Sequence, residues 1–196
     1  MIETLEDLAA FTDADARALP PSMADHALIK TPGLSADEVA ALHALLPGLP
    51  DSYLDCVSRV TFWRAQLAGF FLWPPSGRHG QLRDRLAEAN ERDDLIAADV
   101  LRAHDLLAVA SAEIDPICVR RRGASGRPGE VVWVDLTSAP EPVVRPLAPD
   151  FATFLIVAGR LEQASREGSD LDDVLAGYID DQGHRQVWEV HASMML

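Results

Sequence analysis

The heptapeptide Glu130-Val-Val-Trp-Val-Asp-Leu136 alternates its side chains with the two-residue period of a β-strand. Its two faces carry different residues, Val132, Val134 and Leu136 on one and Val131, Trp133 and Asp135 on the other. Further short apolar runs flank it at 106–110, 117–119 and 143–144. The loops between these runs are short, and short loops favour antiparallel neighbours over parallel crossovers. The second half of the chain therefore predicts antiparallel strands.

Helices are predicted before and after these strands. Ser35-Ala-Asp-Glu38 is a capping box, in which a hydroxyl and a carboxylate each bind a free backbone N–H, so a helix begins after Ser35. Asp150 is a second helix N-cap, followed by a stripe of apolar residues. Helices are also expected at 4–18, from Asp51, at 79–92 and at 170–179, with a strand at 67–73 and a short tail that contains Val187, Trp188 and Val190. Together these elements predict one α+β domain over residues 1–196, with a mainly antiparallel sheet of about four to six strands packed against helices.

The composition is that of a globular, acidic protein. The 196 residues are 48% hydrophobic, which excludes intrinsic disorder. The longest apolar stretches are less than half of the about 18 residues that a membrane span needs, so no membrane association is expected. The first residues lack the basic-then-apolar order of a secretory signal, and the chain has only two cysteines. Both features favour a reducing cytoplasm.

The net charge of −14 is concentrated at the two ends of the chain. Residues 1–50 hold 8 acids and 2 bases, and residues 151–196 hold 8 acids and 3 bases. Such a surface repels a phosphate backbone, so direct nucleic-acid binding is disfavoured and a basic protein partner is favoured. The alternative is that the acidity only keeps the protein in solution.

One acidic segment, 167–181, contains no base and is the candidate partner-binding surface. Its acids are Glu167, Asp170, Asp172, Asp173, Asp180 and Asp181. They are expected to steer a cationic partner, which raises the association rate more than the intrinsic affinity. The alternative is an ordinary solvated helix face. A basic segment, 120–122 with Arg127, is interpreted as a solvated hairpin tip.

Motifs for catalysis or for a cofactor are lacking. The six histidines do not have the helical spacing of a zinc site, and Cys56 and Cys118 lie among apolar neighbours and are expected to be inert. Asp180, Asp181 and His184 form the best metal-like group, although a solvated helix end explains them equally well. We therefore expect no cofactor, no metal and no catalysis. The enzyme alternative predicts a pocket lined by groups such as Asp115, His104 or Asp135.

The order of several segments resembles the SUKH superfamily, named after the fungal cell-wall-assembly regulators Smi and Knr. The helix after Ser35 ends at Leu49-Pro50-Asp-Ser-Tyr53, similar to the family's "Leu-Pro-x-x-Tyr" step. The similar segments that follow are Gly69-Phe-Phe-Leu-Trp-Pro74, Leu106-Leu-Ala-Val-Ala-Ser111, Asp115-Pro-Ile-Cys-Val119, Glu130-Val-Val-Trp-Val-Asp135 and Leu147-Ala-Pro-Asp-Phe-Ala-Thr-Phe-Leu155. The resemblance covers residues 35–162 as a core with helical extensions at both ends. Two motifs depart from the family: Ala112-Glu-Ile replaces the usual glycine turn before Asp115, and Ser58-Arg-Val-Thr replaces an aromatic-Asn-Gly-Gly stretch.

The resemblance implies a non-catalytic protein-binding module. Bacterial members are widely associated with immunity to polymorphic toxins, so the main expectation is an immunity protein that binds and neutralises a cognate toxin, for example a basic nuclease domain. The alternative that the resemblance leaves open is an intracellular regulatory or scaffolding protein without a toxin partner. The second alternative is the unrecognised enzyme.

Overall fold

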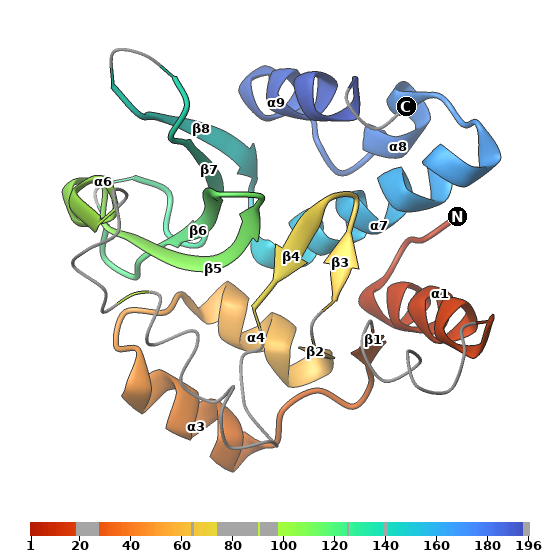
Figure 1. Ribbon diagram of the computed structural model, residues 1–196. Coiled ribbons are helices and arrows are strands. Elements are labelled where there is room, and N and C mark those ends of the chain that lie inside the picture. Colours follow the sequence, from red (N-terminus) through yellow and green to blue (C-terminus); the bar gives the residue numbers. More distant parts are fainter. Residues whose placement is uncertain are drawn as a thin grey trace.

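The computed structural model describes residues 1–18, 28–63, 65–73, 90, 98–124, 126–138 and 141–193, which form a single α+β domain (Figure 1). The helices are α1 (Leu5–Ala18), α3 (Ala36–Leu45), α4 (Asp51–Arg59), α6 (Ala98–Ala103), α7 (Phe151–Glu167), α8 (Leu171–Leu175) and α9 (Gln182–Ala192). The strands are β1 (Leu28–Lys30), β2 (Thr61–Trp63), β3 (Gln66–Leu67), β4 (Phe70–Leu72), β5 (Leu106–Ala112), β6 (Asp115–Arg120), β7 (Val131–Asp135) and β8 (Val143–Ala148). None of the helices described is long and apolar enough to cross a membrane.

The main sheet has six antiparallel strands in the order β3-β4-β5-β6-β7-β8, which confirms the predicted fold class. A separate antiparallel pair joins β1 to β2. The alternation in β7 is also confirmed, because Val131 lies in the larger core cluster whereas Val132 and Val134 lie in the smaller one. Apolar side chains therefore cover both faces of the central strands.

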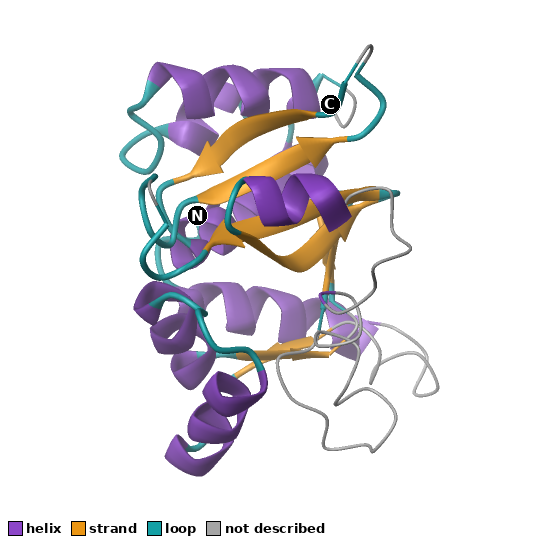
Figure 2. Cartoon of the chain, turned by 90° about the vertical axis from the view of Figure 1, so that its left-hand side faces the viewer, coloured by secondary structure: helices purple, strands orange, loops and turns teal. Residues whose placement is uncertain are grey.

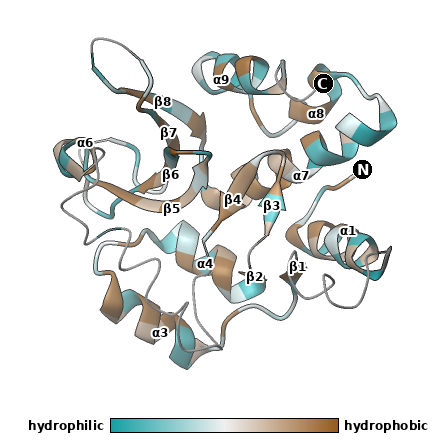
Figure 3. Ribbon diagram, viewed as in Figure 1, coloured by the Kyte–Doolittle hydropathy of each residue, from teal (hydrophilic) through white to brown (hydrophobic). Residues whose placement is uncertain are grey.

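Helices pack on both faces of the sheet. The larger core lies against α7, which contributes Phe154 and Leu155, and against α9, which contributes the fully buried Trp188. On the other face, α6 contributes Leu101 to the smaller cluster (Figure 2). In Figure 3 the strands β4 and β5 are mostly apolar, whereas α4 and α9 alternate between apolar and polar residues, as expected for helices with one buried face.

The two capping predictions are confirmed. The Ser35 hydroxyl accepts from the Glu38 N–H, and the Glu38 carboxylate accepts from the Ser35 N–H at 2.8 Å. The Asp150 carboxylate accepts from the Thr153 N–H at 2.8 Å at the start of α7. The helices expected at 4–18 and from Asp51 are also present, as α1 and α4.

Three element predictions were wrong. The expected strand at 67–73 is a hairpin, β3 and β4, because Ala68 (φ 46°) and Gly69 (φ 82°) form a tight left-handed turn inside it. The strand β8 does not stop before Pro146 but runs through it, since an edge strand tolerates the missing N–H. The expected helix at 170–179 is only the five-residue α8, which a turn with Gly177 at φ 76° follows.

The C-terminal tail is likewise different from the prediction, because it is the helix α9. Four of its buried residues, His184, Val187, Trp188 and His191, recur with helical spacing. The helix expected at 79–92 lies outside the described residues, apart from Asn90. The side chain of Asn90 bonds both the N–H and the C=O of Ala108, at 2.8 and 2.9 Å.

Candidate partner-binding surface

All six acids of the candidate surface are exposed, at the end of α7, around α8 and before α9. Glu167 ends α7, Asp170 is the N-cap of α8, and Asp172 and Asp173 lie in the first turn of α8. Asp180 precedes Asp181, which is the N-cap of α9. An ion pair between Asp172 and Arg185 joins α8 to α9. The fold therefore gathers the 167–181 segment on one side of the molecule, above the C-terminal end of α7 (Figure 1).

Four of these acids have local partners. The Asp170 carboxylate accepts from the Asp172 N–H at 2.9 Å. The Asp181 carboxylate accepts from the N–H groups of His184 and Gly183 at 3.1 and 2.8 Å, and these bonds lower the pKa of Asp181. Glu167 accepts from Gln163 Nε2 at 2.9 Å, and Asp172 is paired with Arg185. For these four acids, local structure explains the residue type.

Asp173 and Asp180 differ from the other four acids. Within the described part of the chain, neither carboxylate accepts a hydrogen bond or joins an ion pair. Neither therefore has a visible role in holding α8 or α9 in place through its side chain. These two carboxylates are the ones most available to a partner.

The N-terminal acids join the same side of the molecule, which sequence reasoning missed. The Tyr178 hydroxyl donates to the Glu3 carbonyl at 2.8 Å, so the exposed Glu3 lies beside the segment that follows α8. Arg166 of α7 binds Asp15 of α1 at 2.7 Å. The two acidic ends of the sequence are thus neighbours in the fold (Figure 1). No local sequence signal could have shown this, because the contacts join residues about 150 or more positions apart.

A hollow on the outer side of α9, partly open to solvent, does not add to the acidic character. It is lined by Gln182, Gly183, Arg185, Gln186 and Glu189. Its charged groups are paired, since Arg185 contacts Glu189 at 3.3 Å and also binds Asp172. The hollow is therefore of mixed charge and gives no preference for a cationic ligand.

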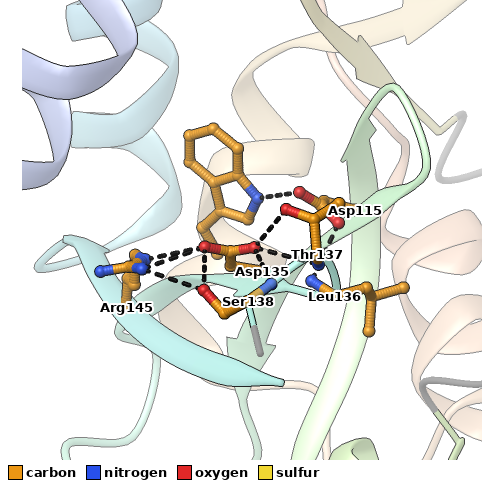
Figure 4. Close-up of polar contacts among 7 residues, drawn as sticks. Asp115, Asp135, Leu136, Thr137, Ser138 and Arg145 are labelled. Carbon is orange, nitrogen blue, oxygen red and sulfur yellow. Dashed lines mark hydrogen bonds and ion pairs between the residues drawn. The ribbon is translucent and has the colours of Figure 1, made fainter. Parts of the chain in front are cut away.

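The enzyme alternative named Asp115 and Asp135, which lie near each other at one end of β6 and β7 (Figure 4). Asp115 is buried and accepts from Trp133 Nε1 and from the Leu136 N–H, both at 3.0 Å. Each of its two carboxylate oxygens therefore accepts a hydrogen bond from within the protein. The carboxylate ties the β6 end to the turn that follows β7.

Asp135 binds a different set of groups. Ser138 Oγ donates to it at 2.7 Å and Thr137 Oγ1 at 2.9 Å, and Arg145 forms an ion pair at 3.0 Å. Partial burial raises the pKa of Asp135, but the hydrogen bonds from Ser138, Thr137 and Arg145 outweigh it and hold the pKa at about 2. A carboxylate that stays ionised at neutral pH is poorly suited to general acid–base work there.

His104 does not join the two aspartates. It is exposed and precedes β5, at the end of the hairpin where Leu106 pairs with Arg120. Asp115 lies at the opposite end of the same hairpin, where it pairs with Ala112. The residues of the enzyme alternative are therefore not brought together.

The metal-like group is incomplete in the described part of the chain. His184 is buried, and its ring nitrogens lie 3.4 Å from Glu130 Oε1 and 3.4 Å from Asp181 Oδ1. Glu130 is itself bound by Arg120 at 2.7 Å. Among the residues that the structure describes, no three histidine, cysteine or acidic side chains are placed to hold a metal ion.

The basic segment and the two cysteines show no sign of a binding or catalytic role among the described residues. In the basic segment, Arg120 is paired with Glu130 and Arg122 with Asp51, so the hairpin tip is partly neutralised. Both cysteines are buried and free. Burial raises the pKa of Cys56 to about 12 and raises that of Cys118 as well, so neither thiol is a reactive thiolate at neutral pH.

Comparison with known proteins adds no relative. No protein-family model, no curated protein and no solved structure matches this chain.

Proposed function

We propose that this chain is a non-catalytic protein-binding module of the cytoplasm, and specifically an immunity protein that binds and neutralises a cognate toxin. The observation that carries the proposal is the acidic side of the molecule, where the two acidic ends of the sequence meet. The resemblance of residues 35–162 to the SUKH superfamily is the reason for proposing that the partner is a toxin. If no toxin binds, the alternative is a regulatory or scaffolding protein without a toxin partner.

The electrostatics of this surface favour a basic partner. The chain carries a net charge of −14, and Asp173 and Asp180 hold exposed carboxylates that join no ion pair among the described residues. Such groups raise the rate of association with a cationic surface, and the rate falls steeply as salt is added. A nuclease domain presents a positive surface to its phosphate substrate, so an anionic protein can occupy the same surface. The same charges oppose direct binding of nucleic acid.

The decisive experiment is co-purification with the product of a neighbouring toxin gene, together with a protection assay in cells that express the toxin. We expect a stable complex and survival of the cells. If the purified proteins form no complex and co-expression gives no protection, the immunity proposal is wrong. Binding of a different cellular protein in the same pull-down would instead support the regulatory alternative.

A variant pair tests whether the acidic surface makes the contact. Asp173→Asn with Asp180→Asn should slow association several-fold at low salt and little at high salt, because screening removes long-range attraction. The matched control is Asp37→Asn with Glu113→Gln, two exposed acids elsewhere on the molecule that change the net charge equally. If both pairs slow association equally, the net charge and not this surface steers the partner.

A further inference from the structure

The turn between β3 and β4 is held by side chains from two helices. Ala68 begins this turn, is fully buried and has φ 46°, a left-handed conformation that is strained in a residue other than glycine. Its N–H donates to Glu162 Oε2 of α7 at 2.9 Å, and its carbonyl accepts from His191 Nε2 of α9 at 2.7 Å. Both backbone polar groups of a strained, buried residue therefore depend on side chains that are distant in the sequence.

The contact with Ala68 decides which nitrogen of the neutral His191 ring carries the proton. A carbonyl oxygen can only accept, so the proton lies on Nε2, and Nδ1 carries none. Nδ1 is buried and has no hydrogen-bond partner. A second proton would bind to Nδ1, where it would find no acceptor. The charged form of the ring is therefore disfavoured in this position.

Aromatic rings enclose His191. Phe70 of β4 stacks on the imidazole with the ring centres 4.3 Å apart, and the rings of Trp133 and Trp188 lie edge-on at 5.5 and 6.2 Å. His191 is buried within this aromatic cage. The cage offers no polar atom that could compensate a charge on the imidazole at Nδ1.

The charged side chains around the cage are bound to other groups. They are Glu162 of α7, which bonds Ala68 and Arg166, Asp115 of β6, which bonds Trp133, and Glu189 of α9, which pairs with Arg185. Within the described part of the chain, no ion pair joins His191 to a carboxylate. Burial therefore lowers the pKa of His191, and the bond to the Ala68 carbonyl opposes this only in part.

We propose that His191 is an acid-sensitive latch, whose neutral ring holds the β3–β4 turn against the last turn of α9 and whose protonation releases the two from each other. The charged ring moves out to water, the Ala68 carbonyl loses its donor, and the strain at Ala68 then favours opening of the turn. The earlier part of α9 keeps its own anchor, because Trp188 Nε1 donates to the Leu147 carbonyl at 2.7 Å. The release is therefore local, and the central strands stay paired.

Amide hydrogen exchange of the full chain tests the latch. The reporter is the Ala68 N–H, and the reference is the set of N–H groups that pair β6 with β7. A released His191 ring titrates near its ordinary pKa of 6.5. Between pH 7.5 and pH 5.5 the protection factor of Ala68, corrected for the intrinsic exchange rate, should therefore fall about tenfold, and that of the reference less than about twofold. An unchanged Ala68, or an equal fall in β6 and β7, would overturn the proposal.

Two variants separate His191 from the other titratable groups. His191→Gln keeps an N–H donor for the Ala68 carbonyl but takes up no proton, so the fall in protection should disappear. The matched control is His184→Gln, because His184 is the other buried histidine of α9 but lies beside carboxylates and not among aromatic rings. In this variant the fall should persist. A fall that persists in His191→Gln, or disappears in His184→Gln, would refute the latch.

A measurement on the wild type remains decisive if either variant does not fold. The NMR signals of the His191 ring and the protection of the Ala68 N–H are followed over the same pH range. Because one proton drives both changes, they should share one midpoint. Two different midpoints would assign the opening to another group and overturn the proposal. Since no partner is present, these results are independent of the toxin-binding test.

Discussion

The carboxylates at the end of β7 and those around α8 belong to the same residue type but have opposite environments. Asp115 and Asp135 each accept two or more hydrogen bonds from the protein, with exposed fractions of 7% for Asp115 and 17% for the Asp135 side chain. Asp173 and Asp180 are exposed and accept none within the described residues. The first pair holds strands and turns together, and the second pair faces solvent. An acidic residue therefore indicates a contact surface only after its own hydrogen bonds have been identified.

The largest expected effect is at Asp115. Asp115→Ala leaves the indole N–H of Trp133 and the N–H of Leu136 without their acceptor in a partly buried place. An unsatisfied buried donor costs about 1–3 kcal/mol, so the free energy of unfolding should fall by about 2–4 kcal/mol. Urea unfolding measures this loss. Asp115→Asn, which keeps one acceptor oxygen, should lose less, and a loss below about 1 kcal/mol for Asp115→Ala would contradict the structural role.

The pH dependence of Asp135 is the next effect. Its pKa of about 2 in the folded protein lies below the ordinary value of 3.8, so the unfolded chain binds its proton first. The stabilisation is therefore complete above about pH 4 and is lost as the pH falls towards 2, and it amounts to at most about 2 kcal/mol. The advantage of the wild type over Asp135→Asn should shrink over this range. An advantage that stays constant from pH 6 to pH 2 would show that Asp135 is not held by these bonds.

His191 gives a second pH effect, in which the folded protein favours the neutral form of the side chain and not the charged form. Burial lowers the pKa of His191 below 6.5, although its Nε2, 2.7 Å from the Ala68 carbonyl, partly opposes this. The unfolded chain therefore takes up the proton more readily, so the stability contributed by the neutral ring falls as the pH decreases through 6.5. Unfolding measured between pH 8 and pH 5 should show a smaller decline in His191→Gln than in the wild type. Equal declines would mean that the ring is not desolvated as the structure has it.

The sequence predicted the regular parts of the fold better than its turns. The alternation in β7 and the caps at Ser35 and Asp150 depend on neighbouring residues, so they could be read locally. The β3–β4 turn was missed because Ala68, and not glycine or asparagine, occupies its first left-handed position. The helix α9 was missed because two of its buried positions are His184 and His191, which do not count as apolar in a simple pattern.

The candidate surface was predicted only in part, for a related reason. All six acids are exposed as an acidic surface requires, but Asp170 and Asp181 turned out to be helix caps and Asp172 an ion-pair partner. Caps of this kind could have been found from the sequence, since aspartate is a preferred N-cap. The position of Glu3 beside Tyr178 and the burial of Arg160 under α8 could not have been found from the sequence, because both depend on contacts between distant segments.

A smaller effect is expected at Glu113, an exposed acid whose importance lies in its backbone. It has φ 52° in the β5–β6 turn. In the SUKH superfamily, which the sequence resembles, this turn usually contains a glycine. A non-glycine residue in this region is strained, so Glu113→Gly should raise the free energy of unfolding by about 0.5–1 kcal/mol after the greater entropy of glycine is subtracted. Glu113→Ala removes the same charge but keeps the strain, so it should bring no such gain. A gain with both variants would assign the effect to charge.

The smallest effect on stability is expected at Asp180. It is informative because Asp115, another acidic residue, is expected to have the largest effect. Asp180→Asn removes an exposed charge without a local partner among the described residues, so the free energy of unfolding should change by less than about 0.5 kcal/mol. Added salt should stabilise the wild type slightly more than this variant, because the repulsion within a chain of net charge −14 is screened. A loss near that of Asp115→Ala would place Asp180 among the structural carboxylates. The acidic surface would then have fewer groups to offer a partner than the fold suggests.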